Sequence, residues 1–82
     1  MAIFVPHAGL ARLLGASEVR SQASTVGALL EEVRALVTEQ EWELARRAAV
    51  LVNGRHVHHL KGMSTPLKDD DEVWMVFPAA GG

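Results

Sequence analysis

The clearest pattern of hydrophobic and polar positions lies in the middle of the chain. Apolar residues recur there at intervals of three and four, which places them on one face of a helix; they are Val26, Leu29, Leu30, Val33, Leu36 and Val37. Ser24 or Thr25 precedes them and offers a hydroxyl that caps the free N–H groups of a first helical turn. The pattern predicts a helix over residues 26–37 whose apolar face covers a sheet.

Short apolar runs bounded by turn residues predict strands on both sides of this helix. The expected strands are Ala2–Val5, the weakly alternating edge strand Ser17–Gln22, Ala49–Val52, Arg55–Leu60 and Val73–Phe77. Asn53 and Gly54 separate the third strand from the fourth, and both residues tolerate the positive φ of a type I′ turn. These two strands are therefore expected to form a hairpin.

Three further segments give weaker signals. Leu10–Gly15 is an apolar connection closed by a glycine, and it is interpreted as a loop or a single turn. The composition of Glu39–Ala48 favours a second short helix, with Trp42 and Leu44 as its inward anchors. Asp69–Glu72 is interpreted as a solvated turn, because it lacks the spaced oxygen ligands and the glycine of a calcium-binding loop.

These elements together predict an α+β fold. Their order fits a mixed sheet of four to five strands covered by one main helix, with the first and last strands as parallel neighbours, which is a β-grasp arrangement. Pro78 ends the last strand because it has no N–H to donate, and no large side chain follows it. We therefore expect a β-grasp domain over residues 1–78 and a flexible tail over residues 79–82.

Composition narrows the classes of function. A chain of 82 residues buries too little surface to divide into two cores, so one domain is expected. A formal net charge of -2 supplies no basic surface for nucleic acid or anionic lipid. No segment has the pattern of a signal peptide or the roughly 18 apolar residues of a membrane span. The expected protein is cytoplasmic, with neither nucleic acid nor membrane as its partner.

The side chains offer little chemistry of their own. The absence of cysteine excludes disulfides, thiolate metal sites and a cysteine nucleophile. His56, His58 and His59 fall in the expected fourth strand, where the first two share a face and the third points away. Solvated histidines are therefore favoured over a metal site, and no metal is expected. Because no nucleophile, base and orienting group can be assembled, the chain is not expected to be an enzyme.

The C-terminal third carries a resemblance to a known family. Pro66–Val73 and Phe77–Gly82, together with Asn53-Gly54 and the helix start at Thr25–Leu30, resemble the ubiquitin-like sulfur carriers. That family includes the small subunit of molybdopterin synthase, the thiamine sulfur carrier and the carriers of cysteine biosynthesis. The chain departs from the family at Asp70, where many relatives have a glycine in the acidic turn.

The resemblance implies a function for the end of the chain. In the family, an adenylating enzyme of the ubiquitin-activating type uses ATP to convert the terminal carboxylate to an acyl-adenylate. A sulfur donor protein displaces AMP and leaves a thiocarboxylate, which a downstream synthase consumes. Applied to this chain, the resemblance implies that Gly82 is the modified residue and that Gly81, Ala80 and Ala79 form the narrow tail. The chain would bind no permanent cofactor and would act as a carrier, or as the small subunit of a sulfur-transferring synthase.

Small tail residues also suit this task on physical grounds. Glycine has no Cβ to obstruct a close approach of the backbone, and five extended residues after Phe77 reach about 17 Å. The carboxylate can therefore enter a cleft while the folded body docks outside. Such docking requires an apolar surface near the tail, for which Phe77, Pro78 and Leu67 are the candidates.

Three functions stay open from the sequence. The first is a sulfur carrier, of the molybdopterin or cysteine type. The second is a ubiquitin-like protein modifier, joined through Gly82 to lysines of target proteins. The third is a non-covalent β-grasp binding module with an incidental tail. Only the third would keep its activity after deletion of Gly81 and Gly82.

Overall fold

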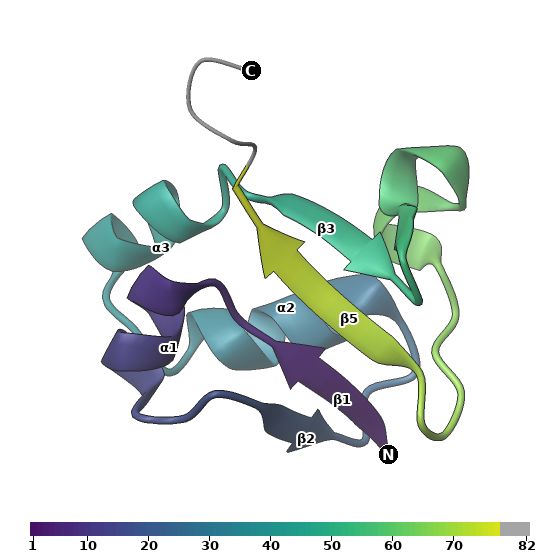
Figure 1. Ribbon diagram of the computed structural model, residues 1–82, viewed down its shortest axis with the longest axis horizontal. Helices are drawn as coiled ribbons and strands as arrows, with labels where there is room; N and C mark the ends of the chain where they lie inside the picture. Colours follow the sequence, from purple (N-terminus) through teal and green to yellow (C-terminus); the bar gives the residue numbers. More distant parts are fainter. Residues whose placement is uncertain (78–82) are drawn as a thin grey trace.

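A computed structural model describes residues 1–77 of the chain (Figure 1). The strands of this part are β1 (Ala2–Val5), β2 (Val19–Ser21), β3 (Ala49–Val52), β4 (Arg55–His56) and β5 (Glu72–Val76). Its helices are α1 (Ala8–Leu14), α2 (Val26–Arg34) and α3 (Glu39–Ala45), and two short 3₁₀ helices, η1 (Val57–His59) and η2 (Gly62–Ser64), follow β4. No helix within residues 1–77 is long and apolar enough to cross a membrane.

The strands form one mixed sheet in the order β2-β1-β5-β3-β4. β1 and β5 run parallel, as the sequence predicted, and the other pairs are antiparallel. The strand that comes last along the described chain thus occupies the centre of the sheet (Figure 1). This topology, with α2 lying across one face, confirms the predicted β-grasp fold.

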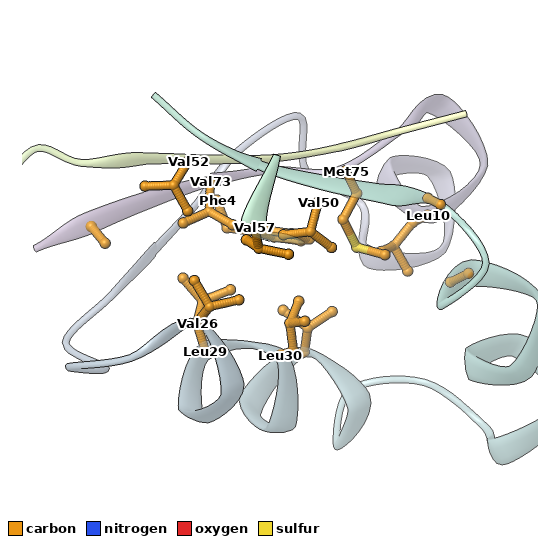
Figure 2. Close-up of a cluster of buried hydrophobic side chains, with 14 of the residues drawn as sticks. Phe4, Leu10, Val26, Leu29, Leu30, Val50, Val52, Val57, Val73 and Met75 are labelled. Carbon is orange, nitrogen blue, oxygen red and sulfur yellow. The ribbon is translucent and has the colours of Figure 1, made fainter. Parts of the chain in front are cut away.

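The hydrophobic core lies between the sheet and α2 (Figure 2). Alternate residues of the strands point into it, and the apolar stripe of α2 meets them; the labelled members include Phe4, Val50, Val52, Val73 and Met75 from the sheet and Val26, Leu29 and Leu30 from the helix. Burial of each such side chain contributes roughly 1.5–3 kcal/mol. Among residues 1–77, no helix lies over the opposite face of the sheet (Figure 1).

The helix predicted over residues 26–37 ends earlier, at Arg34. A tighter turn follows, in which the N–H of Leu36 donates to the carbonyl of Val33 at 3.0 Å. This turn swings Leu36 outward, so 62% of the residue is exposed and its predicted place on the inner face is wrong. Thr38 then opens α3 with a capping box, because its hydroxyl accepts from the N–H of Glu41 while the Glu41 carboxylate accepts from the N–H of Thr38.

Of the two residues predicted to anchor α3 in the core, one is buried and the other is exposed. Trp42 is buried, with 7% of the residue exposed, whereas Leu44 is 62% exposed. Ala45 takes the second inward position, because residues three apart share a helical face and residues two apart do not.

The segment interpreted as a loop at Leu10–Gly15 is instead the helix α1. His7 caps its first turn, since the Nδ1 atom of His7 accepts from the N–H of Leu10 at 3.2 Å. Gly15 closes the helix in the left-handed region, at φ 70°, where its N–H donates to the carbonyl of Ala11. Leu10 is fully buried between these two caps.

The hairpin after β3 forms as predicted, with φ values of 50° at Asn53 and 85° at Gly54. The predicted strand over residues 55–60 is wrong beyond His56, because the chain turns there into η1. The Nδ1 atom of His56 accepts from the N–H of His58 and supports this turn. The turn carries Val57 into the core, and its burial favours the break in the strand.

The acidic segment before β5 is a turn, as predicted. Asp70 adopts a left-handed φ of 68°, a conformation that glycine accommodates more easily than residues with a Cβ. The Asp71 carboxylate accepts from the N–H of Lys68 and from the side chain of Asn53, and these bonds lower the pKa of Asp71. The turn therefore ties the hairpin loop to the start of β5.

Candidate functional site

The root of the tail is held by an aromatic contact. Phe77 follows β5 directly and is 50% exposed. Its ring packs against the imidazole of His7, with 4.6 Å between the ring centroids and 55° between the planes. His7 is itself fixed by its capping bond to Leu10. The last described residue is therefore positioned by the start of α1.

The His7 ring has a fixed protonation pattern. Burial lowers the pKa of His7 from its ordinary value of 6.5, so the ring is neutral near pH 7. Because Nδ1 accepts a hydrogen bond, the single proton of the neutral ring lies on Nε2. Nε2 is buried and has no hydrogen-bond partner within residues 1–77. No pattern in the sequence indicated this contact, because His7 and Phe77 lie far apart along the chain.

The uncovered face of the sheet presents an apolar row beside Phe77. Val5, Trp74 and Leu51 lie directly opposite one another on β1, β5 and β3, and Ile3 and Val76 share their face through the strand alternation. Trp74 is 41% exposed, and its indole N–H donates to the Glu72 carboxylate at 2.9 Å. We call this surface the open face, made of Ile3, Val5, Leu51, Trp74 and Val76.

The residues predicted to form the docking surface are not neighbours. Leu67 precedes β5, packs half-buried against the core, and donates its N–H to the carbonyl of Ser24 at 2.9 Å. Phe77 lies at the other end of β5. The five residues of β5 separate Leu67 from Phe77, and the joint role of these residues with Pro78 in docking stays a prediction. Phe77 packs against His7 and, by the alternation that puts Val76 on the open face, does not belong to that face.

The predicted tail residues lie outside the described part of the chain. They are Pro78, Ala79, Ala80, Gly81 and Gly82. Their roles in docking and in activation stay predictions, and the described geometry defines only the point from which the tail departs.

The three histidines of the 56–59 segment cluster differently from the sequence prediction. In η1 the rings of His58 and His59 lie 4.4 and 6.3 Å from that of His56, measured between centroids, so the strand alternation assigned to them is wrong. The Nδ1 atom of His56 is occupied by the N–H of His58. Within residues 1–77, no group of three or more His, Cys, Asp or Glu residues could hold a metal ion.

Comparison with known sequences gives two findings. The ThiS family matches residues 7–82, which includes the whole tail. Small archaeal modifier protein 3 of Haloferax volcanii is 46% identical over 43 residues, which make up 52% of this chain and 47% of that protein. The chain thus matches about half the length of this curated relative.

Solved structures share the fold over nearly the full length. The Amycolatopsis orientalis BexX/CysO complex contains a chain that matches with a TM-score of 0.80 and 21% identity, over 100% of both chains. Small archaeal modifier protein 1 from Methanosarcina acetivorans matches with a TM-score of 0.73 and 21% identity, over 99% of this chain and 95% of that one. At these identities the likeness establishes the ubiquitin-like β-grasp fold.

Proposed function

We propose, because the chain belongs to the ThiS family, that it is a sulfur carrier whose Gly82 carboxylate is adenylated and then converted to a thiocarboxylate. The observation that carries the proposal is the extent of the family match, which runs through the tail to Gly82. A β-grasp body with Phe77 at the root of that tail supports it.

The chemistry explains why a partner enzyme is needed. A carboxylate is a poor acyl donor until one oxygen becomes part of a good leaving group. Attack of the Gly82 carboxylate on the α-phosphate of ATP releases pyrophosphate and forms the acyl-adenylate. The outer sulfur of a persulfide on a donor protein then attacks the acyl carbon, and AMP leaves with one of the former carboxylate oxygens. A thiol cleaves the resulting acyl disulfide, which releases the thiocarboxylate and leaves a disulfide between that thiol and the donor. The carrier supplies the acyl group, while ATP binds to the adenylating enzyme.

The open face is our candidate for the surface that meets this enzyme and the sulfur-accepting synthase. It combines the exposed Trp74 with half-buried apolar neighbours and ends beside Phe77, the exposed residue from which the tail departs. Aromatic side chains contribute strongly to the binding energy of many interfaces. Trp74 and Phe77 are the residues whose truncation is expected to weaken docking most. The sulfur acceptor belongs to a molybdopterin-type or a cysteine-type pathway in this proposal.

Intact-protein mass spectrometry tests the activation directly. The full chain is incubated with its adenylating enzyme, ATP and a sulfur donor, and the expected product gains the mass of sulfur in place of one oxygen at Gly82. A variant lacking Gly81 and Gly82 serves as the control and should stay unmodified. Absence of a mass gain with an enzyme that adenylates the chain would contradict sulfur transfer.

A protein modifier is the second candidate, favoured by the name of the Haloferax volcanii relative. In that function a lysine amine of a target attacks the activated Gly82 carbonyl and forms an isopeptide bond. Denaturing gels of cells that express a tagged chain should then show larger conjugates, which disappear when Gly82 is deleted. Detection of the free protein alone would count against this candidate.

A further inference from the structure

An apolar cleft lies on the helix-covered side of the sheet, where residues of α2, α3, η2, β3 and β5 come together. Its volume is about 490 Å³, which is within the range of roughly 300–1,000 Å³ that is common for binding pockets. Figure 2 shows how Leu30 of α2 faces Val50 of the sheet at this end of the core. The apolar lining consists of Leu30, Trp42, Val50, Met63 and Met75.

Met63 is the exposed wall of this cleft, with 49% of the residue accessible to solvent. Its backbone lies close against α2, because a Cβ at Gly27 would come within 3.1 Å of the carbonyl oxygen of Met63. The main chain of η2 is therefore held beside the helix while the methionine side chain stays open to solvent. Methionine is unbranched and adapts to apolar groups of many shapes, which suits it to binding surfaces.

A second cleft, of about 370 Å³, continues the first, since Arg46, Val50 and Met63 line both. We call the two clefts together the lateral groove. Glu31 lines only the apolar cleft, where Nη1 of Arg34 lies 3.7 Å from its carboxylate. No Asp or Glu within residues 1–77 lines the second cleft. Its other polar lining residues are Arg47, His56 and His58.

The second cleft is cationic because the sequence separates its charges. Residues 45–68 contain five Lys or Arg and no Asp or Glu, although the net charge of the whole chain is -2. Arg47 is exposed and forms no salt bridge within residues 1–77. Arg46 donates to Glu43 at 3.0 Å through Nε, which leaves the terminal nitrogens of its guanidinium for another acceptor. Both arginines can therefore bind carboxylates of a partner.

We propose that the lateral groove binds a segment of a partner protein in which acidic residues follow one large apolar residue. The apolar side chain enters the cleft between Trp42 and Met63, and the carboxylates meet Arg46 and Arg47. Trp42 and Arg46 lie one helical turn apart, about 6 Å. Two residues of an extended peptide span that distance, so the acidic residues begin within two positions of the apolar one.

The end of this chain is a poorer occupant, because no large side chain follows Phe77 to fill the apolar cleft. Binding in the lateral groove also needs none of the chemistry proposed for Gly82. A chain that lacks Gly81 and Gly82 cannot undergo the proposed activation, yet it should bind the partner segment with unchanged affinity. The two proposals can therefore fail separately.

Nuclear magnetic resonance of the ¹⁵N-labelled full chain tests the binding. The probe is a four-residue peptide, one phenylalanine followed by three glutamates, acetylated and amidated at its ends. One control peptide replaces the glutamates with glutamine, and another replaces the phenylalanine with alanine. Each control should bind roughly tenfold more weakly than the probe.

The two tryptophans of the chain report where the probe binds. The indole N–H signal of Trp42, which lines the groove, should shift on addition of the probe. The indole of Trp74 lies on the open face and donates to Glu72, so its signal should change little. A spectrum of Trp74→Phe, which retains only one indole signal, assigns the two.

Two pairs of variants test the two halves of the groove. Arg47→Glu should weaken binding roughly tenfold, whereas Arg20→Glu, the same charge change on β2 at the edge strand beyond β1, should leave it within about twofold. Met63→Ala should weaken binding roughly threefold, whereas Leu44→Ala removes an exposed apolar side chain outside the groove and should have no effect. All four residues are exposed, so dispersed amide spectra should confirm that each variant folds.

Four results would overturn the proposal. Equal binding of either control peptide would remove the selection for carboxylates or for an apolar side chain. A shift of Trp74 in place of Trp42 would locate the peptide on the open face. Groove signals that shift with protein concentration in the absence of peptide would assign the groove to a second copy of the chain. Tighter binding by the chain that lacks Gly81 and Gly82 would assign the groove to the chain's own end.

Discussion

His7 combines two structural roles in one side chain. Its Nδ1 atom caps α1, and its ring supports Phe77 at the root of the tail. Both roles use the neutral ring, because a protonated Nδ1 could not accept the N–H of Leu10. Histidine is an uncommon helix cap, and its contact with Phe77 joins the two ends of the described chain. Neither role could be read from the local sequence pattern.

The buried ring of His7 makes a prediction about pH. Its pKa is lowered in the folded state, so the unfolded chain binds the proton more readily. The free energy of unfolding should be highest above the ordinary pKa of 6.5 and should fall as the pH decreases below it toward the folded pKa. Urea denaturation at several pH values measures this dependence.

His7→Asn is the matched variant for this measurement. Asparagine retains a side-chain oxygen that can cap α1 but does not titrate. The variant should therefore show a flatter dependence of unfolding free energy on pH between about 5 and 7, whatever its absolute stability. An identical slope in both proteins would assign the pH dependence to other groups.

Asp70 gives a second prediction at the residue scale. Its φ of 68° lies in the left-handed region, where a Cβ is disfavoured and glycine is not. We expect Asp70→Gly to be more stable than Asp70→Ala by about 1 kcal/mol, after allowance for the greater freedom of glycine in the unfolded chain. Thermal or urea unfolding of the two variants measures the difference. Equal stabilities would show that the turn relaxes to another conformation.

Secondary-structure elements were predictable where the apolar positions of the sequence are the positions buried in the core. The stripe of α2, the strand β1 and the alternation of β5 are all set by burial on one face. The ends of elements were less predictable, because caps and turns compete there with the pattern. Leu36 continues the helical spacing but falls in a turn, and Val57 interrupts a possible strand because the core accepts its side chain.

The contrast between Trp42 and Leu44 tests the packing of α3. The two residues are two positions apart on one helix, yet only Trp42 is buried. Trp42→Ala should reduce the free energy of unfolding by about 3 kcal/mol or more, whereas Leu44→Ala should change it by less than about 0.5 kcal/mol. Urea denaturation measures both values. A large loss in Leu44→Ala would mean that its side chain contacts the core in solution.

At the scale of the whole molecule, the sheet depends on its central strand. β5 pairs with β1 on one side and β3 on the other, and it contributes the buried side chains of Val73 and Met75. The sequence indicated the parallel pairing because the topology of such folds is restricted. It did not indicate that His7 at the start of α1 would pack against Phe77 at the root of the tail, because that contact is set by three-dimensional packing.

Truncated chains test which part of the sequence the β-grasp domain needs in order to fold. A chain that ends at Phe77 retains every described strand and should unfold at nearly the same temperature as the full chain. A chain that ends at Asp71 lacks β5 and should not fold, because β1 and β3 lose their common neighbour. Circular dichroism and amide spectra check both outcomes. A folded product without β5 would contradict the central role assigned to that strand.

The central position of β5 also has a consequence for synthesis on the ribosome. The other strands emerge first, but β1 and β3 cannot join until Glu72–Val76 has left the exit tunnel. The complete sheet can therefore form only late in the synthesis of the chain. Prematurely terminated products would present unpaired strands to proteases and chaperones. An enzyme that recognises the assembled open face would therefore bind only chains that have been translated through Val76. Truncated chains cannot form this face and would not be bound.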